Sequence, residues 1–104
     1  MNNELLKTQS LFGLDKEFFI KNQLLRILDN STTYLTTAEL TNRFFEVSQD
    51  TIQQACRILK SDIERLYSEN ECRLIIHQRY GIKLVRKQKS LKKLLNYYIQ
   101  QELS

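Results

Sequence analysis

The sequence predicts a mainly helical domain with one small β-hairpin. Three observations support this fold class. Polar residues flanked by an apolar pair recur as candidate helix starts, and apolar residues at helical spacing follow them. One of only two glycines divides a β-rich run into two short strands. With 104 residues, 41% of them apolar, the chain can build one modest core.

The first helix is predicted over residues 15–30. Asp15 is its expected N-cap, because Leu14 and Phe19 occupy the positions of an apolar pair that packs across a first helical turn. Its apolar stripe consists of Ile20, Leu24, Ile27 and Leu28.

The second and third helices form a short-then-long pair. The second is predicted over 37–45, with Thr36 as N-cap and Glu39 completing a capping box. After a short connection at 45–47, the third is predicted over 48–66 with Ser48 as N-cap. The expected buried stripe of this third helix is Ile52, Cys56, Leu59, Ile63 and Leu66.

A hairpin and a last helix complete the order. The hairpin is predicted over 72–85, and we expect Gly81 to supply the backbone conformation that its turn requires. Tyr34 and Leu35 could add a short third strand. The last helix is expected to begin at Ser90 and to carry on one side Leu91, Leu94, Leu95, Tyr98 and Ile99.

This order predicts a particular arrangement. A short helix, a tight turn and a longer helix with a polar outer face make a helix-turn-helix, and a following hairpin makes the winged variety. We therefore expect a winged helix-turn-helix domain over 1–88, with a three-helix core and a wing. Residues 89–104 are expected to form a C-terminal helix that leads into a regulatory domain absent from this chain.

Catalytic and metal chemistry find little support in the residue types present. Cys56 and Cys72 fit no metal-ligand or redox spacing, so we expect reduced, buried thiols. His77 is the only histidine, and Gly13 and Gly81 are the only glycines, which excludes a multi-histidine metal site and a glycine-rich phosphate loop. The prediction is a protein that is not an enzyme and takes no cofactor, metal or small-molecule ligand in this domain.

The sequence also shows no pattern typical of a membrane helix or of a signal peptide. No apolar run approaches the roughly 18–20 residues of a membrane helix. The first ten residues lack the basic-then-apolar pattern of a signal peptide. We expect a cytoplasmic protein without a membrane partner.

Charge is strongly segregated along the chain. Residues 1–71 hold eight Lys/Arg and eleven Asp/Glu, a net charge of −3. Residues 72–104 hold eight Lys/Arg and a single acid, a net charge of +7. Such segregation favours a polyanionic partner.

The outer face of the third helix suggests how that partner is read. A helix of this kind fits a major groove, where Gln pairs with adenine, Arg with guanine, and Asp accepts from the cytosine amino group. The expected base-reading residues are Gln49, Asp50, Gln53, Gln54 and Arg57.

A second group of residues is expected on the sugar–phosphate side. The basic wing, 72–87, would lie on the phosphate backbone or in the minor groove, and the start of the third helix would contact phosphate. The residues predicted to make these contacts are Thr37, Ser48, Thr51, Lys60, Arg79, Tyr80, Lys83, Arg86 and Lys87. The expected partner is therefore double-stranded promoter DNA.

One alternative stays open. Outward Gln and Asp side chains are common on helices that bind nothing, and a winged helix can serve as a protein–protein interaction or dimerisation module. The apolar side of the last helix would then be the docking surface. A homodimer through this C-terminal helix, or through domains outside this chain, is a further expectation.

Residues 5–100 resemble the N-terminal winged-helix domain of Mga-type regulators, a group of virulence regulators of Gram-positive bacteria. The resemblance rests on a Y-x-T strand leading into x-E-L, a V-S-x-x-T-I helix start, an L-x-x-D-I run and a wing ending in G-x-x-L. The residues that match are Tyr34, Thr36, Glu39, Leu40, Val47, Ser48, Thr51, Ile52, Leu59, Asp62, Ile63, Gly81 and Leu84. DeoR-like and phosphotransferase-linked activators share these elements.

What the resemblance implies is a transcription regulator whose DNA-binding domain precedes regulatory and dimerisation domains. Such regulators respond to sugar-transport phosphorylation. The family often has an arginine where this chain has Asp50. Because an acid repels phosphate, this departure shifts the expected affinity from the third helix to the wing.

Overall fold

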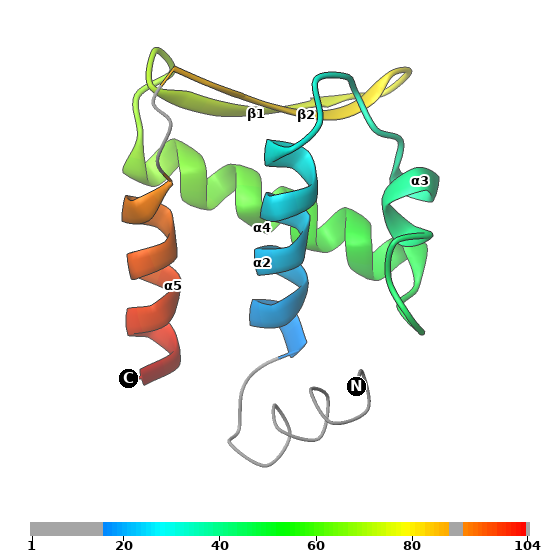
Figure 1. The fold of residues 1–104 in the computed structure, drawn as a ribbon, viewed down its shortest axis with the longest axis horizontal. Coiled ribbons are helices and arrows are strands. Elements are labelled where there is room, and N and C mark those ends of the chain that lie inside the picture. Colours follow the sequence, from blue (N-terminus) through cyan, green and yellow to red (C-terminus); the bar gives the residue numbers. More distant parts are fainter. Residues whose placement is uncertain (1–15, 88–90, 104) are drawn as a thin grey trace.

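The computed structural model describes residues 16–87 and 91–103, which form four helices and one hairpin (Figure 1). The elements are α2 (Lys16–Asp29), α3 (Thr37–Thr41), α4 (Gln49–Leu66), β1 (Cys72–His77), β2 (Gly81–Arg86) and α5 (Lys92–Leu103). Figure 1 shows α2 and α5 as neighbouring antiparallel columns, with α4 crossing them and the hairpin spanning one end. The predicted mainly helical fold with a hairpin is confirmed. The predicted helix starts at Asp15 and Ser90, and the predicted domain boundary at 88/89, lie outside the described residues.

Local side-chain bonds explain where α3 and α4 begin. The Glu39 N–H donates to Thr36 Oγ1 at 3.1 Å, and the Thr36 N–H donates to Glu39 Oε1 at 2.8 Å, which completes the predicted capping box. Hydrogen bonding from Thr36, chiefly from its backbone N–H, stabilises the ionised carboxylate and holds the pKa of Glu39 below its usual value. Ser48 Oγ accepts the Thr51 N–H at 3.1 Å and caps α4 as predicted.

The end of α3 differs from the prediction. The helix stops at Thr41 rather than continuing to residue 45, and the chain tightens into a turn in which the Arg43 and Phe44 N–H groups bond three residues back. Glu46 then takes a positive φ of 54°, which redirects the chain toward the Ser48 cap. The connection between α3 and α4 therefore runs over 42–48 and is longer than predicted.

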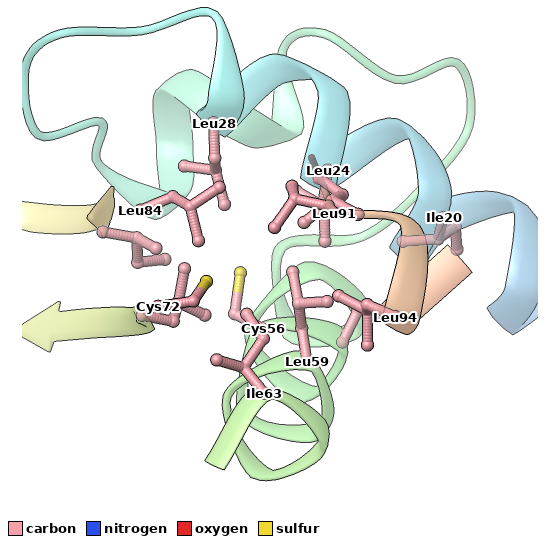
Figure 2. Close-up of a cluster of buried hydrophobic side chains, with 14 of the residues drawn as sticks. Ile20, Leu24, Leu28, Cys56, Leu59, Ile63, Cys72, Leu84, Leu91 and Leu94 are labelled. Atoms are coloured by element: carbon pink, nitrogen blue, oxygen red, sulfur yellow. The ribbon is translucent and has the colours of Figure 1, made fainter. Parts of the chain in front are cut away.

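All the major elements contribute to one core (Figure 2). Ile20, Leu24 and Leu28 of α2 point toward Cys56 and Leu59 of α4. Of the predicted α4 stripe, Ile52, Cys56, Leu59 and Ile63 are buried, and Leu66 at the helix end is half-buried. On α2 the buried residue is Leu25 where Ile27 was predicted, because α5 covers that flank of the helix.

The hairpin is joined to the rest of the chain by one more backbone pairing. β1 and β2 are antiparallel, with Leu74 opposite Leu84 and His77 opposite Gly81. The Leu35 N–H donates to the Ile82 carbonyl at 2.9 Å, and the Ile82 N–H donates to the Leu35 carbonyl at 2.7 Å. The third strand suggested for Tyr34 and Leu35 is therefore a single β-bridge at Leu35.

The apolar side of α5 is only partly covered. Leu91, just before the helix, and Leu94 and Tyr98 within it are buried in the core. Leu95 and Ile99, predicted to share that side, remain 37% and 48% exposed. Packing against α2 and α4 covers one flank of the predicted stripe and leaves the other open.

A buried polar cluster lies between α2, α4 and α5. The Tyr98 hydroxyl donates to Asp62 Oδ2 at 2.8 Å, and Lys21 Nζ lies 3.7 Å from the same oxygen and 4.2 Å from the centre of the Tyr98 ring. All three residues are buried, and they connect α2, α4 and α5. Burial and the neighbouring carboxylate raise the pKa of Tyr98 far above its ordinary value, so this hydroxyl remains a donor.

No helix within residues 16–87 and 91–103 has the length and apolarity needed to cross a bilayer.

Candidate nucleic-acid interface

The structure brings the five predicted base-reading residues together on the exposed side of α4. Their side chains are all solvent-exposed, while the apolar stripe of the helix turns toward α2. The residues are Gln49, Asp50, Gln53, Gln54 and Arg57. At 100° per residue they span an arc of about 140°, so they divide into two flanks of one helix.

Gln49, Gln53 and Arg57 form one of these flanks. They follow each other at four-residue spacing, and Lys60 continues the flank toward the hairpin. Lys60 and the next-turn Glu64 line a groove together with the β1 residues Cys72 to Ile76. This flank of α4 therefore lies on the hairpin side of the molecule.

Gln54 lies on the other flank. Together with Thr51 and Ile58 it lines a shallow depression beside Lys16 and Ile20 at the start of α2. Among the predicted base-reading residues, Gln54 is thus the one turned away from the hairpin.

The charge of α4 is balanced. The helix carries three basic residues, Arg57, Lys60 and Arg65, and three acidic residues, Asp50, Asp62 and Glu64. Lys60 Nζ is held by Glu64 at 2.6 Å, which neutralises one predicted phosphate contact within the helix. Asp50 is exposed in the first turn, where it adds negative charge close to the capped start of α4.

The hydroxyl groups at the start of α4 already have partners. Ser48 Oγ accepts the Thr51 N–H and lies 2.8 Å from Thr51 Oγ1. Both side chains are exposed at the start of α4, where backbone N–H groups favour an anion. Thr37 is the first residue of α3 and is half-buried.

Positive charge on the hairpin is less compensated. Arg73, Arg79, Lys83 and Lys87 have no ion-pair partner within the part of the chain that the structure describes. Arg73 and Lys83 alternate with the inward-facing Leu74 and Ile82, which directs them to the outer face of the hairpin. We call these four residues the hairpin cations.

Arg86, also predicted to contact DNA, has a different setting. Its guanidinium makes a two-pronged contact with Asp29 at the end of α2, including an Nη2–Oδ2 bond of 2.9 Å. Both side chains are largely covered, so this pair fastens β2 to α2. Lys93, counted in the basic segment by sequence, donates to the Leu66 carbonyl at 3.1 Å and caps the end of α4.

An aromatic cluster at the hairpin tip was not foreseen from the sequence. The rings of His77 and Tyr80 are stacked with centroids 4.6 Å apart, and Tyr34 lies 5.9 Å from Tyr80. Lys83 Nζ lies 5.5 Å from the centre of the Tyr34 ring. His77 Nδ1 accepts the backbone N–H groups of Arg79 and Tyr80. These contacts order the tip that carries Arg79.

The buried cysteines take no part in this surface. Both are free and packed in the core, as predicted. Burial raises the pKa of Cys56 to about 12 and that of Cys72 to about 11. Within the described residues there is no group of three side chains suited to hold a metal ion.

Neither a scan against protein-family models nor searches of curated proteins and of solved structures found a match.

Proposed function

We propose that this chain is a winged helix-turn-helix domain that binds double-stranded promoter DNA as part of a transcription regulator. In this proposal α3 and α4 form the helix-turn-helix, α4 enters the major groove, and the β1–β2 hairpin is the wing on the phosphate backbone. The Mga-type resemblance of the sequence agrees with this role, and membership of that family is part of the proposal.

A single observation carries the proposal. Lys60 and Glu64, on the flank of α4 that also carries Gln49 and Gln53, line a groove with Arg73, one of the hairpin cations. A cationic hairpin can hold phosphate while the amides and Arg57 on the neighbouring flank of α4 hydrogen-bond to bases, which fits the division between positioning contacts and base reading. The balanced charge of α4 means that this helix adds little to nonspecific attraction.

A salt titration tests the proposal. Binding of a fluorescent 20–30 base-pair duplex to the 104-residue chain would be followed by anisotropy at several salt concentrations. If the hairpin cations neutralise about four phosphates, log K should fall against log salt with a slope of about −4. Absence of binding at low salt would contradict the proposal.

A matched pair of variants locates the interface. Lys83→Gln removes one hairpin cation and should weaken binding to every duplex, because its phosphate contact is independent of sequence. Arg26→Gln removes one exposed cation from the side of α2 that lines a groove with α5. This control should leave DNA affinity unchanged. Equal losses in both variants would mean that only net charge matters.

A further inference from the structure

The exposed side of α5 carries an apolar stripe with charged ends. Leu95, Ile99 and Leu103 follow at four-residue spacing and are 37%, 48% and 82% exposed. Lys92 and Glu102 flank them near the two ends of the helix. At 100° per residue these five residues fall within an arc of about 100°, so they share one helix face. We call this face the α5 stripe.

The stripe continues into a groove shared with α2. Phe18, Asn22 and Leu25 line this groove from α2, and Leu91, Leu95 and Ile99 line it from the α5 side. An apolar face of this kind on a small domain indicates a contact surface.

The α5 stripe can pair with a second, antiparallel copy of itself. Leu95 and Ile99 are equidistant from position 97, and so are Lys92 and Glu102. A second α5 lying antiparallel, with its two-fold axis near residue 97, therefore sets Leu95 against Ile99 and Lys92 against Glu102. Both the apolar pair and the charged pair are satisfied by one register, as an isologous two-fold interface requires.

We propose that the α5 stripe binds a second copy of this chain, forming a symmetric dimer through antiparallel α5 helices. The groove-lining residues Phe18 and Asn22 lie on the side of α2 opposite Leu24, which points toward α4. The dimer therefore leaves the outer face of α4 open, and its formation does not depend on the proposed DNA binding.

The size of the helix predicts a weak dimer. Twelve residues of α-helix extend about 18 Å, which is short for a contact surface, since stable complexes bury about 1,200 Å² or more. We expect a dissociation constant on the order of 10–100 μM for the 104-residue chain.

Sedimentation equilibrium over a range of protein concentrations, without DNA, measures this association. Ile99→Glu should weaken it at least tenfold. Ile76→Glu is the matched control, because Ile76 is a 40% exposed isoleucine on β1, outside the stripe. Circular dichroism melting would verify that both variants fold. A monomer at all concentrations up to about 1 mM would overturn the proposal, as would equal losses in both variants.

Charge reversal tests the antiparallel register itself. Lys92→Glu and Glu102→Lys should each weaken the dimer several-fold by opposing like charges, and the double variant should recover the original dissociation constant. Within one helix these positions are about 15 Å apart, too far to pair with each other. Recovery therefore reports a contact between two chains, whereas a double variant as weak as the singles would refute this register.

Discussion

Gly81 serves the fold in two ways. Its φ of +105° lies in a region that side chains rarely adopt, and it allows β2 to start directly after the turn. It also lets the backbone of Leu35 approach, because a Cβ at this position would lie 2.3 Å from the Leu35 carbonyl oxygen. The glycine therefore permits the bridge that connects the hairpin to the segment before α3.

Replacing this glycine should be costly. Gly81→Ala combines backbone strain with a clash against the fixed backbone of Leu35, so we expect the free energy of unfolding to fall by at least about 2 kcal/mol. Urea unfolding followed by circular dichroism measures it. Gln78→Ala in the exposed turn is the control and should stay within about 0.5 kcal/mol. A similarly small loss in Gly81→Ala would show that Leu35 can move away freely.

The sequence predicts the turn at Gly81 but not the close approach to Leu35. The turn is a local property of the residues around it, whereas the approach depends on which residue of a distant segment pairs with Ile82. The same long-range register brings Tyr34 beside Tyr80, so the aromatic cluster could not be derived from local pattern. Residues 77 and 80 flanking a tight turn were the only local sign of it.

At the scale of elements, α4 and the hairpin differ in net charge. The hairpin, with residue 87, carries five basic residues and no acid, and one of them is bound to Asp29. α4 is neutral overall and presents amides. Under the proposed function, the hairpin should therefore supply most of the attraction and α4 most of the discrimination between sequences.

This division predicts different phenotypes for α4 and hairpin variants. Gln53→Ala should reduce discrimination between preferred and altered duplexes by about 1–3 kcal/mol while preserving the salt slope. Lys83→Ala should weaken binding to all duplexes and make the salt slope less steep by about 1. Gln54→Ala is the control within α4, because that side chain faces the start of α2 rather than the hairpin. Anisotropy titrations on a panel of duplexes measure affinity, sequence discrimination and salt slope. The same change in all three variants would contradict separate roles for α4 and the hairpin.

Helix starts were predictable because their causes are local. The capping box at Thr36 and the Ser48 cap use residues within three positions of each other. The end of α3 was not predictable in this way, because it depends on the turn at 42–44 and on packing of the half-buried Phe44 against the core. On α5 the apolar stripe was recognised, but periodicity alone does not indicate which flank a neighbouring helix covers.

At the scale of the whole molecule, the Lys21–Asp62–Tyr98 cluster connects three helices through buried polar groups. Asp62 lies at a position of α4 where periodicity alone suggested no special role. Its carboxylate is satisfied by the Tyr98 hydroxyl and faces the Lys21 ammonium. Such a buried network favours one arrangement of α2, α4 and α5 because each group would be left unpaired in another.

Buried thiols should make the whole domain sensitive to alkaline pH. A Cys56 thiol with a pKa near 12 keeps its proton in the folded state, whereas in the unfolded chain it loses the proton above pH 9. Stability is therefore intact below pH 9 and falls as pH rises toward 12, by about 2–3 kcal/mol for this thiol at pH 11. Cys72 acts in the same direction.

Urea unfolding at pH values from 7 to 11 tests this expectation. The free energy of unfolding should be flat with respect to these groups up to pH 9 and should decline beyond it. Cys72→Ala, which removes one of the two thiols, should make the decline less steep. An unchanged free energy between pH 9 and 11 would mean that the thiols are accessible to solvent in the folded protein.

The neutrality of α4 has a kinetic consequence under the proposed function. A protein searching for its operator must hold nonspecific DNA while its reading surface remains free to disengage at each step. In this protein the hairpin cations would attract DNA of any sequence. Because α4 has no net charge, it would not be held electrostatically in the major groove of a nonspecific site. One-dimensional diffusion along DNA should therefore be fast, with brief pauses at partial matches, and its range should shorten with salt while the ranking of sites stays the same.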